Sequence, residues 1–391
     1  MSLSPVRSHA AVRTSTLRRT TSYWRRLDWL LVAAAILASL VGSVLVWSAS
    51  RSDLASETDT QSFLKKHLLN LAVGLVMCLL VSRLDHRLMR AYLPFFYIGS
   101  VLLLFVPFLP SPIGTSTGGA RAWIGLIPGF TIQPSEFAKI AIIVGMALLL
   151  SEKQDAESVP SDRAVLLSLA IAALPIGIVL LQNDTGTVLV MCTVVLSIIA
   201  VSGARARWIY GLVLGGLTLA LAAVQFGLLK SYQIDRLTSF WDPANSSESA
   251  TFNVEQARIA IGGGGWFGRG LFQGPQTQGN FVPVNESDFV FTVAGEELGF
   301  VGSALLLLLL GIVLWRALRI AYRAGDLFGR LVATGVVAWL AFQMFENVGM
   351  SLGIMPVTGV PLPFVSYGGT SMFATWIAIG LLQSVWIHRD G

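Results

Sequence analysis

The chain has 391 residues, of which 54% are hydrophobic and only 13% carry a charge, and its mean hydropathy is +0.69. Soluble domains usually contain about 25% charged residues, so this composition excludes a soluble globular protein and indicates a polytopic membrane protein. The net charge of +5 comes largely from an N-terminal tail and alternate loops, which favours contact with anionic lipid head groups over nucleic-acid binding.

Apolar runs long enough to cross about 30 Å of hydrocarbon recur along the chain and predict ten transmembrane helices. Because backbone in lipid must satisfy its own hydrogen bonds, we expect an all-α helical bundle. Residues 1–27 are predicted to be a disordered basic cytoplasmic tail, and 28–391 a single membrane domain. The predicted spans cover residues 28–50, 65–82, 91–110, 135–150, 164–181, 186–202, 207–226, 289–315, 329–351 and 366–387.

Arginines cluster in the tail and in every second loop, at 83–90, 205–207 and 316–330. The excess of basic residues on cytoplasmic loops therefore places both termini in the cytoplasm. The intervening loops face outward, and the largest covers about 227–288, between the seventh and eighth spans. It contains Trp241-Asp242-Pro243 and a run of glycines, so we expect it to be folded and functional.

Cysteine and histidine are scarce. The two cysteines, Cys78 and Cys192, both fall inside predicted spans, and the four histidines lie near loops or ends. None has the spacing of a metal site, so we predict no metal-ligating residue.

The loop before the fourth span contains Arg121, and Gln133-Pro134-Ser135-Glu136 follows it. Pro134 and Ser135 suit the start of a helix. Glu136 and Lys139 are three residues apart and share a helix face. Two interpretations follow: a neutralised ion pair that stabilises the span, or, with Arg121, a cationic site for an anionic head group.

A tight outer hairpin is predicted at Gln182-Asn183-Asp184-Thr185, between the fifth and sixth spans. Asp184 either caps the sixth helix or forms a structural salt bridge with Arg121 or Lys139.

The glycine run from 261 to 270 lacks the strand, the Gly-Lys-Ser/Thr ending and the following helix of a phosphate loop. We expect an irregular backbone at the membrane surface, lining protein or water. Arg258 and Arg269 beside it are candidate contacts for a polar substrate.

Asp288 lies where the large loop meets the eighth span. A charge at that depth is costly unless it has a partner or a functional role such as catalysis. The simplest alternative to a functional role is that Asp288 is the N-cap of the eighth helix. Further along, three prolines between 356 and 363 predict a rigid turn or re-entrant stretch.

Four motifs, in this order, resemble the SEDS family (shape, elongation, division and sporulation) over almost the whole chain. They are Gln133-Pro134-Ser135-Glu136 with Lys139, Asp184-Thr185-Gly186-Thr187, Asp288-Phe289-Val290-Phe291 with Gly295-Glu296-Glu297-Leu298-Gly299, and Pro361-Leu362-Pro363-Phe364 with the residues to Gly369. The segment 347–359 resembles the RodA branch more than the FtsW branch. The chain departs from the family pattern at Glu286-Ser287, where the family has His-Thr before the aspartate.

The resemblance implies a peptidoglycan glycosyltransferase that polymerises lipid II into β-1,4 glycan outside the cytoplasmic membrane during elongation. Lipid II carries an α-linked sugar on a diphosphate, so a single inverting displacement requires a base and positive charge for the leaving group. The family's essential aspartate falls on Asp288, the candidate general base. The candidates for the diphosphate are Arg121, Lys139, Arg258 and Arg269, or a divalent cation such as Mg²⁺ or Mn²⁺. Glu136 and Asp184 join the substrate-binding set, and Glu296 and Glu297 are structural or line its cavity.

The same resemblance implies a class B penicillin-binding protein as partner, with other elongation-complex proteins and no nucleic acid. Ten spans and buried charges also suit a lipid II flippase. Further alternatives are a division-specific FtsW-like polymerase and a scaffold with no activity of its own.

Overall fold

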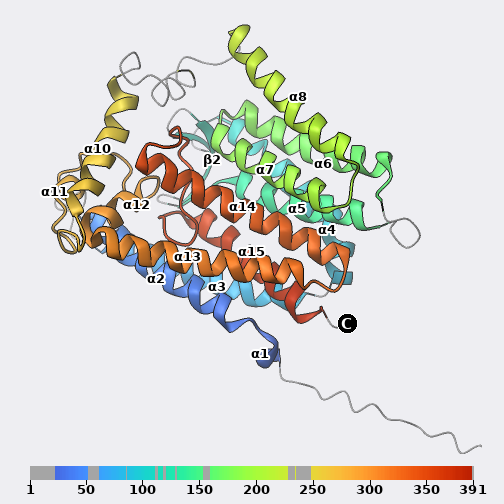
Figure 1. Ribbon diagram of the computed structural model, residues 1–391, viewed down its shortest axis with the longest axis horizontal. Helices are drawn as coiled ribbons and strands as arrows, with labels where there is room; N and C mark the ends of the chain where they lie inside the picture. Colours follow the sequence, from blue (N-terminus) through green and yellow to red (C-terminus); the bar gives the residue numbers. More distant parts are fainter. Residues whose placement is uncertain are drawn as a thin grey trace, which may run out of the picture.

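The computed structural model describes residues 23–51, 61–84, 86–110, 113–117, 120–127, 130–152, 159–227, 234 and 248–389. Its long helices form one bundle (Figure 1). The tail to residue 22 and the segment Trp241-Asp242-Pro243 lie outside the described residues. In chain order the helices are α1 (Tyr23–Arg26), α2 (Trp29–Ser50), α3 (Ser62–Ser82), α4 (His86–Leu103), α5 (Pro134–Ser151), α6 (Asp162–Leu181), α7 (Thr185–Val201), α8 (Ala206–Gln225), α10 (Glu248–Gly264), α11 (Pro275–Gln278), α12 (Val290–Val293), α13 (Gly299–Tyr322), α14 (Leu327–Leu352) and α15 (Gly369–Ile387).

The predicted spans are confirmed as helices. Within the described residues, nine helices are long and apolar enough to cross a membrane, and α7 is a shorter apolar helix. The helical fold class and the multi-pass membrane character are therefore confirmed. The eighth span was predicted to end at 315, but it continues to Tyr322. Its Arg316 is buried against Asp28 of the first span, so this charge does not end the helix.

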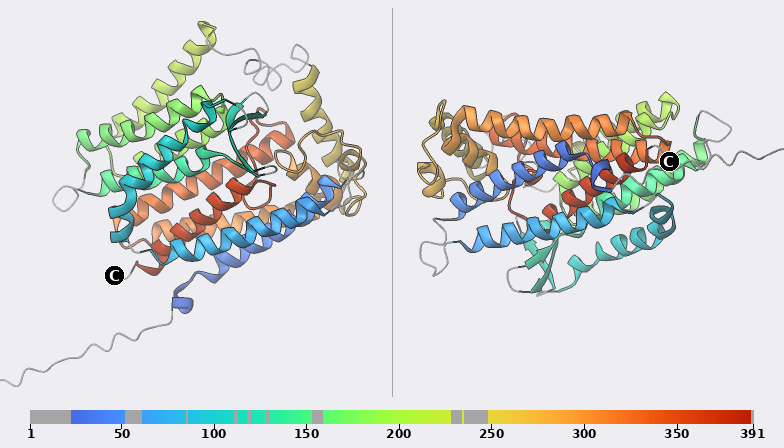
Figure 2. Two further views of the ribbon diagram at one scale, coloured as in Figure 1. Left: turned by 180° about the vertical axis from the view of Figure 1, so that it is seen from behind. Right: turned by 90° about the horizontal axis from the view of Figure 1, so that it is seen from below.

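The two ends of the bundle differ. α10, α11 and α12 gather at one end, which we call the loop end, while α1 and the C-terminus lie at the other (Figures 1 and 2). The connection between α14 and α15, residues 353–368, is also at the loop end, because the N–H of Tyr367 donates to the carbonyl oxygen of Glu286 at 2.9 Å. The candidate residues of the large loop and the proline-rich segment therefore meet.

A small antiparallel sheet adds to the helical fold and was not predicted. It has the order β1 (Gly114–Thr117), β2 (Ala120–Ile127) and β3 (Phe130–Ile132). In its register Gly114 pairs with Ile124, and Ile124 pairs with Ile132. Thr370 attaches the sheet to the start of α15, since its hydroxyl accepts from the N–H of Gln133 at 3.1 Å and donates to Thr131 O at 3.3 Å.

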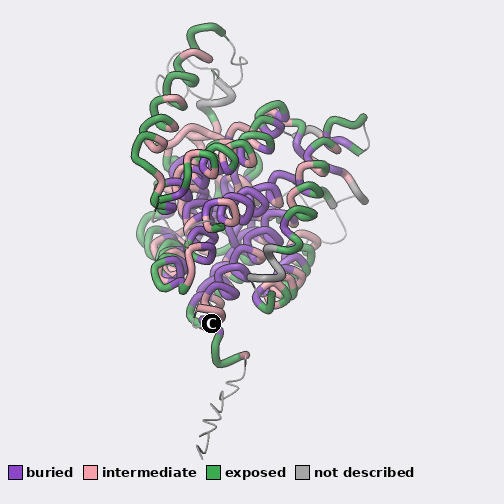
Figure 3. Tube along the Cα trace, turned by 90° about the vertical axis from the view of Figure 1, so that its right-hand side faces the viewer, coloured by how far each residue is buried: buried purple, intermediate pink, exposed green. Residues whose placement is uncertain are grey.

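The core lies in the middle of the bundle, where α5, α14 and α15 are largely buried (Figure 3). Side-chain caps fix several helix starts: Asp28, Ser161, Asp184 and Asp326 each accept from a backbone N–H in the first turn. By contrast, α8 contains no buried residue among those described.

Candidate functional site

Asp288 lies in a tight turn just before α12. The carbonyl oxygen of Val284 accepts from the N–H groups of Ser287 at 3.2 Å and Asp288 at 3.0 Å. The helix begins at Val290 with Phe289 at the N-cap and no side-chain cap. The N-cap interpretation of Asp288 is therefore wrong, and its half-buried carboxylate does not cap the helix.

Three consecutive carbonyl oxygens of this turn are held by three donors. Glu286 O accepts from the N–H of Tyr367 at 2.9 Å. Ser287 O accepts from the hydroxyl of Ser366. Asp288 O accepts from Nδ2 of Asn347 at 2.7 Å. The backbone that carries Asp288 is thus fixed by α14 and by the segment before α15.

The carboxylate of Asp288 faces the proline-rich segment. Its Oδ1 accepts from Oγ of Ser287 at 3.0 Å. Its Oδ2 lies so close to Gly359 that a Cβ atom at this position would be 3.2 Å away. Gly359 has φ +75°, a conformation that glycine adopts most readily. Both the limited space beside the carboxylate and the backbone conformation thus favour glycine at position 359.

Tyr367, whose N–H bonds to the turn, has a partly buried side chain. Burial, and to a lesser extent the negative charge of Glu286, raise the pKa of Tyr367 above its usual value. Its ring packs against α3, with its centre 4.8 Å from that of Phe63.

Deeper in the bundle, Glu136 and Lys139 form the predicted ion pair. Lys139 Nζ lies 2.8 Å from Glu136 Oε1 and donates to Oε1 of Gln343 at 3.1 Å. It also lies 4.5 Å from the centre of the Trp339 ring. Both charged residues are 1% exposed. The ion-pair interpretation is confirmed, and the assignment of Lys139 and Glu136 to substrate stays a prediction.

Asp184 caps α7, which confirms the simpler of its two interpretations. Its Oδ1 accepts from the N–H of Thr187 at 3.1 Å, and its Oδ2 accepts from Nε2 of Gln133 at 2.9 Å. In the described part of the chain it forms no ion pair, so the predicted salt bridge with Arg121 or Lys139 is wrong. Arg121 instead has an exposed side chain on β2, and its N–H donates to Gln182 O at 2.9 Å.

Glu296 and Glu297 lie on a π-helical turn, η3 (Ala294–Leu298), between α12 and α13. Glu296 accepts from the N–H of Gln276 and the N–H of Thr277, each at 2.8 Å, and so caps α11. Glu297 accepts from the hydroxyl of Ser48 at 2.6 Å. These contacts favour the structural interpretation of both residues.

The glycine run packs on this π-helical turn, and it is irregular only after Gly264, because α10 continues to that residue. A Cβ atom on Gly264 would lie 2.0 Å from Gly295 O, and one on Gly268 would lie 2.0 Å from Glu297 O. Glycine is therefore required for close backbone contact. The side chains of Arg258 and Arg269 remain exposed at the loop end, as a role toward a polar substrate requires.

Residues that the sequence reasoning missed are mostly on α14. Gln343, Glu346 and Asn347 are fully buried, and Glu346 lies within electrostatic range of Asp184 and Lys139. Three polar side chains within five residues of an otherwise apolar helix were a usable signal, because buried polar groups in a membrane tend to be functional.

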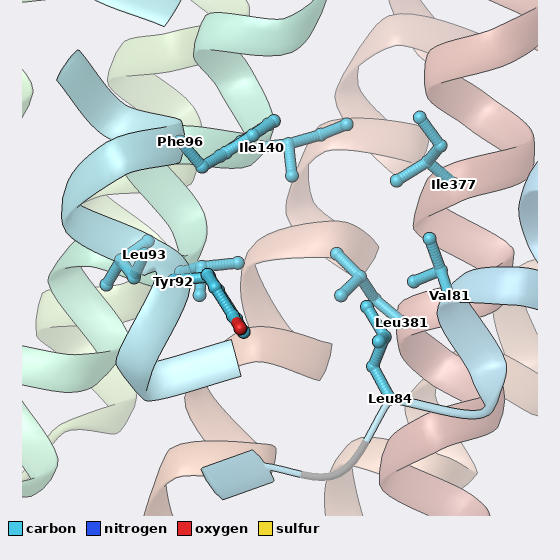
Figure 4. Close-up of a pocket in the computed structure, with 9 residues that line it drawn as sticks. Val81, Leu84, Tyr92, Leu93, Phe96, Ile140, Ile377 and Leu381 are labelled. Carbon is cyan, nitrogen blue, oxygen red and sulfur yellow. The ribbon is translucent and has the colours of Figure 1, made fainter. Parts of the chain in front are cut away.

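Two apolar cavities lie away from these polar residues. One of about 260 Å³ is lined by residues of α3, α4, α5 and α15, among them Val81, Tyr92, Phe96 and Leu381 (Figure 4). The other, about 290 Å³, lies between α13 and α14 and includes Gly311 and Phe345. With almost no polar atoms in their walls, these cavities suit hydrocarbon.

The residues that the structure describes contain no group of three or more His, Cys, Asp or Glu side chains arranged to hold a metal ion. The polar residues at the loop end offer carboxylate, hydroxyl and amide groups, and Arg258 and Arg269 have exposed guanidinium groups.

The chain is similar to known proteins over nearly its whole length. Residues 28–390 match the cell cycle protein family that groups FtsW, RodA and SpoVE. The chain is 37% identical over 361 residues to stage V sporulation protein E of Bacillus subtilis (strain 168), covering 92% of this chain and 96% of that protein. It is 34% identical over 356 residues to peptidoglycan glycosyltransferase MrdB of Escherichia coli (strain K12), covering 90% and 92%.

A solved structure has the same fold. It is described as "Structural coordination of polymerization and crosslinking by a peptidoglycan synthase complex". It is 33% identical in sequence and has a TM-score of 0.75, and the match covers 93% of this chain and 98% of that chain.

Proposed function

Because this chain belongs to the FtsW, RodA and SpoVE family of cell cycle proteins, we propose that it is a peptidoglycan glycosyltransferase that polymerises lipid II. The family includes MrdB, which is named for this activity. The observation that carries the proposal is the position of Asp288, a half-buried carboxylate on a turn that three donors hold by its carbonyl oxygens.

In the proposed reaction Asp288 is the general base. It takes the proton from the 4-hydroxyl of the acceptor sugar as that oxygen attacks the anomeric carbon of the donor. The bond between that carbon and the diphosphate oxygen breaks, and the configuration inverts from α to β. A correctly placed base contributes about 10²–10⁴ in rate, and the contact with Ser287 Oγ orients one of its oxygens.

Positive charge is needed for the departing diphosphate. Arg258 and Arg269 on the large loop and Arg121 on β2 have exposed side chains, so we propose them ahead of Lys139, which is buried against Glu136. A divalent cation is proposed as an alternative counter-ion. It would use oxygen atoms of the substrate as ligands alongside those of the protein.

We propose that the loop end faces outward and that both termini are cytoplasmic. The clustering of arginines at the opposite end supports this orientation. We also propose a class B penicillin-binding protein as partner, which the described role of the solved relative in a peptidoglycan synthase complex supports.

The relatives include a sporulation protein as well as MrdB, so the cellular role is a finer proposal than the activity. We propose a role in elongation, because the segment 347–359 resembles the RodA branch. Fluorescently labelled protein should follow the sidewall or growing tip. Localisation at the septum would instead indicate a division role.

The test of the activity is polymerisation of labelled lipid II by the purified protein in lipid nanodiscs. Wild type should form glycan chains, and Asp288→Asn should lower the rate by about 10²–10⁴. Normal polymerisation by Asp288→Asn would exclude the base assignment. Movement of lipid II across vesicle membranes without any glycan product would indicate a flippase.

A further inference from the structure

Two amide side chains on α14 hold the proline-rich segment. Nε2 of Gln343 donates to Pro361 O at 2.7 Å, and Nδ2 of Asn347 donates to Val360 O at 2.8 Å. The two residues are four apart and share one face of the helix. Both are fully buried, so a lost bond would leave a carbonyl oxygen without a partner away from water.

Asn347 has a second acceptor. The same nitrogen donates to Asp288 O at 2.7 Å. One carboxamide thus ties the turn that carries Asp288 to the segment that carries Gly359, whose missing side chain leaves room for the Asp288 carboxylate. Together with the bonds from Ser366 and Tyr367, this side chain therefore helps to set the distance between these two parts of the site.

Gln343 is fixed from the other side. Its Oε1 accepts from Trp339 Nε1 at 2.6 Å and from Lys139 Nζ at 3.1 Å. Lys139 is in turn paired with Glu136 on α5. A continuous set of contacts therefore runs from the buried ion pair, through two amides of α14, to the main chain of Asp288.

From this arrangement we propose that Asn347 is a positioning residue for Asp288, and that the Glu136–Lys139 pair stabilises the helix face that presents it. The inference rests on the proposed role of Asp288 as the general base. Ser366 and Tyr367 also hold the turn, but they belong to the segment that Asn347 anchors through Val360. Asn347 alone among these three donors comes from a membrane-spanning helix.

The first experiment tests whether Asn347 holds the turn that carries Asp288, and its readout does not depend on catalytic activity. Full-length protein in lipid nanodiscs is followed by hydrogen–deuterium exchange in the peptide that covers residues 284–289. Asn347→Leu removes both bonds at similar volume, and Asn347→Asp keeps the shape but replaces the donor with an oxygen. Either folded variant should exchange faster there than wild type. Unchanged protection in both would overturn the proposal.

The matched control is Ser351→Ala. Ser351 is buried one turn further along α14, and among the residues that the structure describes its hydroxyl bonds only within the helix, to Asn347 O at 3.0 Å. This variant should leave exchange of the 284–289 peptide unchanged.

The second experiment uses lipid II polymerisation. A displacement of about 1 Å can cost about 10² in rate, so Asn347→Leu should lower kcat about 10- to 100-fold while KM changes less than about twofold. In the Asp288→Asn background the same substitution should have no further effect. Multiplicative losses in the double variant would show that Asn347 does not act through Asp288.

A failure of the base role proposed for Asp288 can be distinguished from a failure of the positioning role proposed for Asn347. If Asp288→Asn polymerises as wild type does, the proposed function of Asp288 is wrong, and the exchange experiment still decides whether Asn347 holds the turn.

Discussion

At the scale of single residues, the hold on Asp288 depends little on which side chains precede it. Glu286 and Ser287 replace the His and Thr of the family pattern, but both contribute carbonyl oxygens, which any residue supplies. The side chain of Ser287 also donates from Oγ to Oδ1 of Asp288, and a Thr hydroxyl could make the same bond. The departures at these two positions therefore leave the support of the carboxylate intact.

Gly359 offers a direct test at this scale. Gly359→Ala adds a methyl group 3.2 Å from Oδ2 of Asp288, at φ +75°. We expect the left-handed conformation to cost about 1–2 kcal/mol of stability and displacement of the carboxylate to lower polymerisation by about tenfold. Thermal unfolding and the lipid II assay measure the two effects separately.

Gly203→Ala is the matched control, because Gly203 has φ +80° in the turn after α7. It should lose similar stability but keep its rate. Equal loss of rate in both variants would mean that strain, and not the carboxylate, is responsible.

At the scale of elements, η3 organises the loop end. The N–H of Arg269 donates to Glu296 O at 2.9 Å, and that of Gly270 to Glu297 O at 3.1 Å, so the backbone after α10 is bonded directly to this turn. The two glutamates use their side chains on α11 and α2. π-helical turns are frequent at functional sites, and here the turn supports the large loop.

Glu296→Ala tests this assignment. Loss of the cap should leave buried donors of α11 unsatisfied and lower the free energy of unfolding by about 1–3 kcal/mol. The KM for lipid II should stay close to that of wild type, as measured by initial rates of polymerisation. A KM several-fold higher at unchanged stability would instead place Glu296 in contact with substrate.

At the scale of the whole molecule, a second buried ion pair closes the end opposite to the site. Nε of Arg316 donates to both oxygens of Asp28, at 3.1 and 2.9 Å. Gln383 bonds to the backbone of Asp28, accepting from its N–H at 2.9 Å and donating to its carbonyl oxygen at 3.0 Å. α2, α13 and α15 are therefore joined at one point.

Asp28→Ala should be strongly destabilising, because it leaves the buried guanidinium of Arg316 without its partner. Breaking a buried pair in this way costs about 3–5 kcal/mol. Apparent Tm in detergent measures it. Asp162→Ala, which breaks exposed pairs with Arg205 and Arg207, should shift the Tm much less. Similar shifts for the two variants would contradict this account.

The spans could be predicted because lipid demands an apolar surface wherever it contacts the chain. The Glu136–Lys139 pair followed from its spacing on a helix. Hydropathy does not distinguish α-helical from π-helical turns, so η3 was missed. Nor does it reveal the partners of buried amides: Asn347 and Gln343 bond to residues that only the folded chain brings close. Arg316 was placed in a loop because its charge gives no indication that Asp28, far away in sequence, neutralises it.

The eighth span connects η3 at the loop end to the Arg316–Asp28 pair at the opposite end, and the helical rotation between them fixes how the two are oriented. Each residue of an α-helix turns its successors by about 100° about the axis. Deleting one residue between η3 and Arg316 would swing that guanidinium away from Asp28 while the turn still held Glu296 and Glu297 in place. The number of residues in this segment thus determines the direction in which Arg316 points relative to η3. Insertions or deletions here should therefore be tolerated far less than substitutions of its lipid-facing leucines.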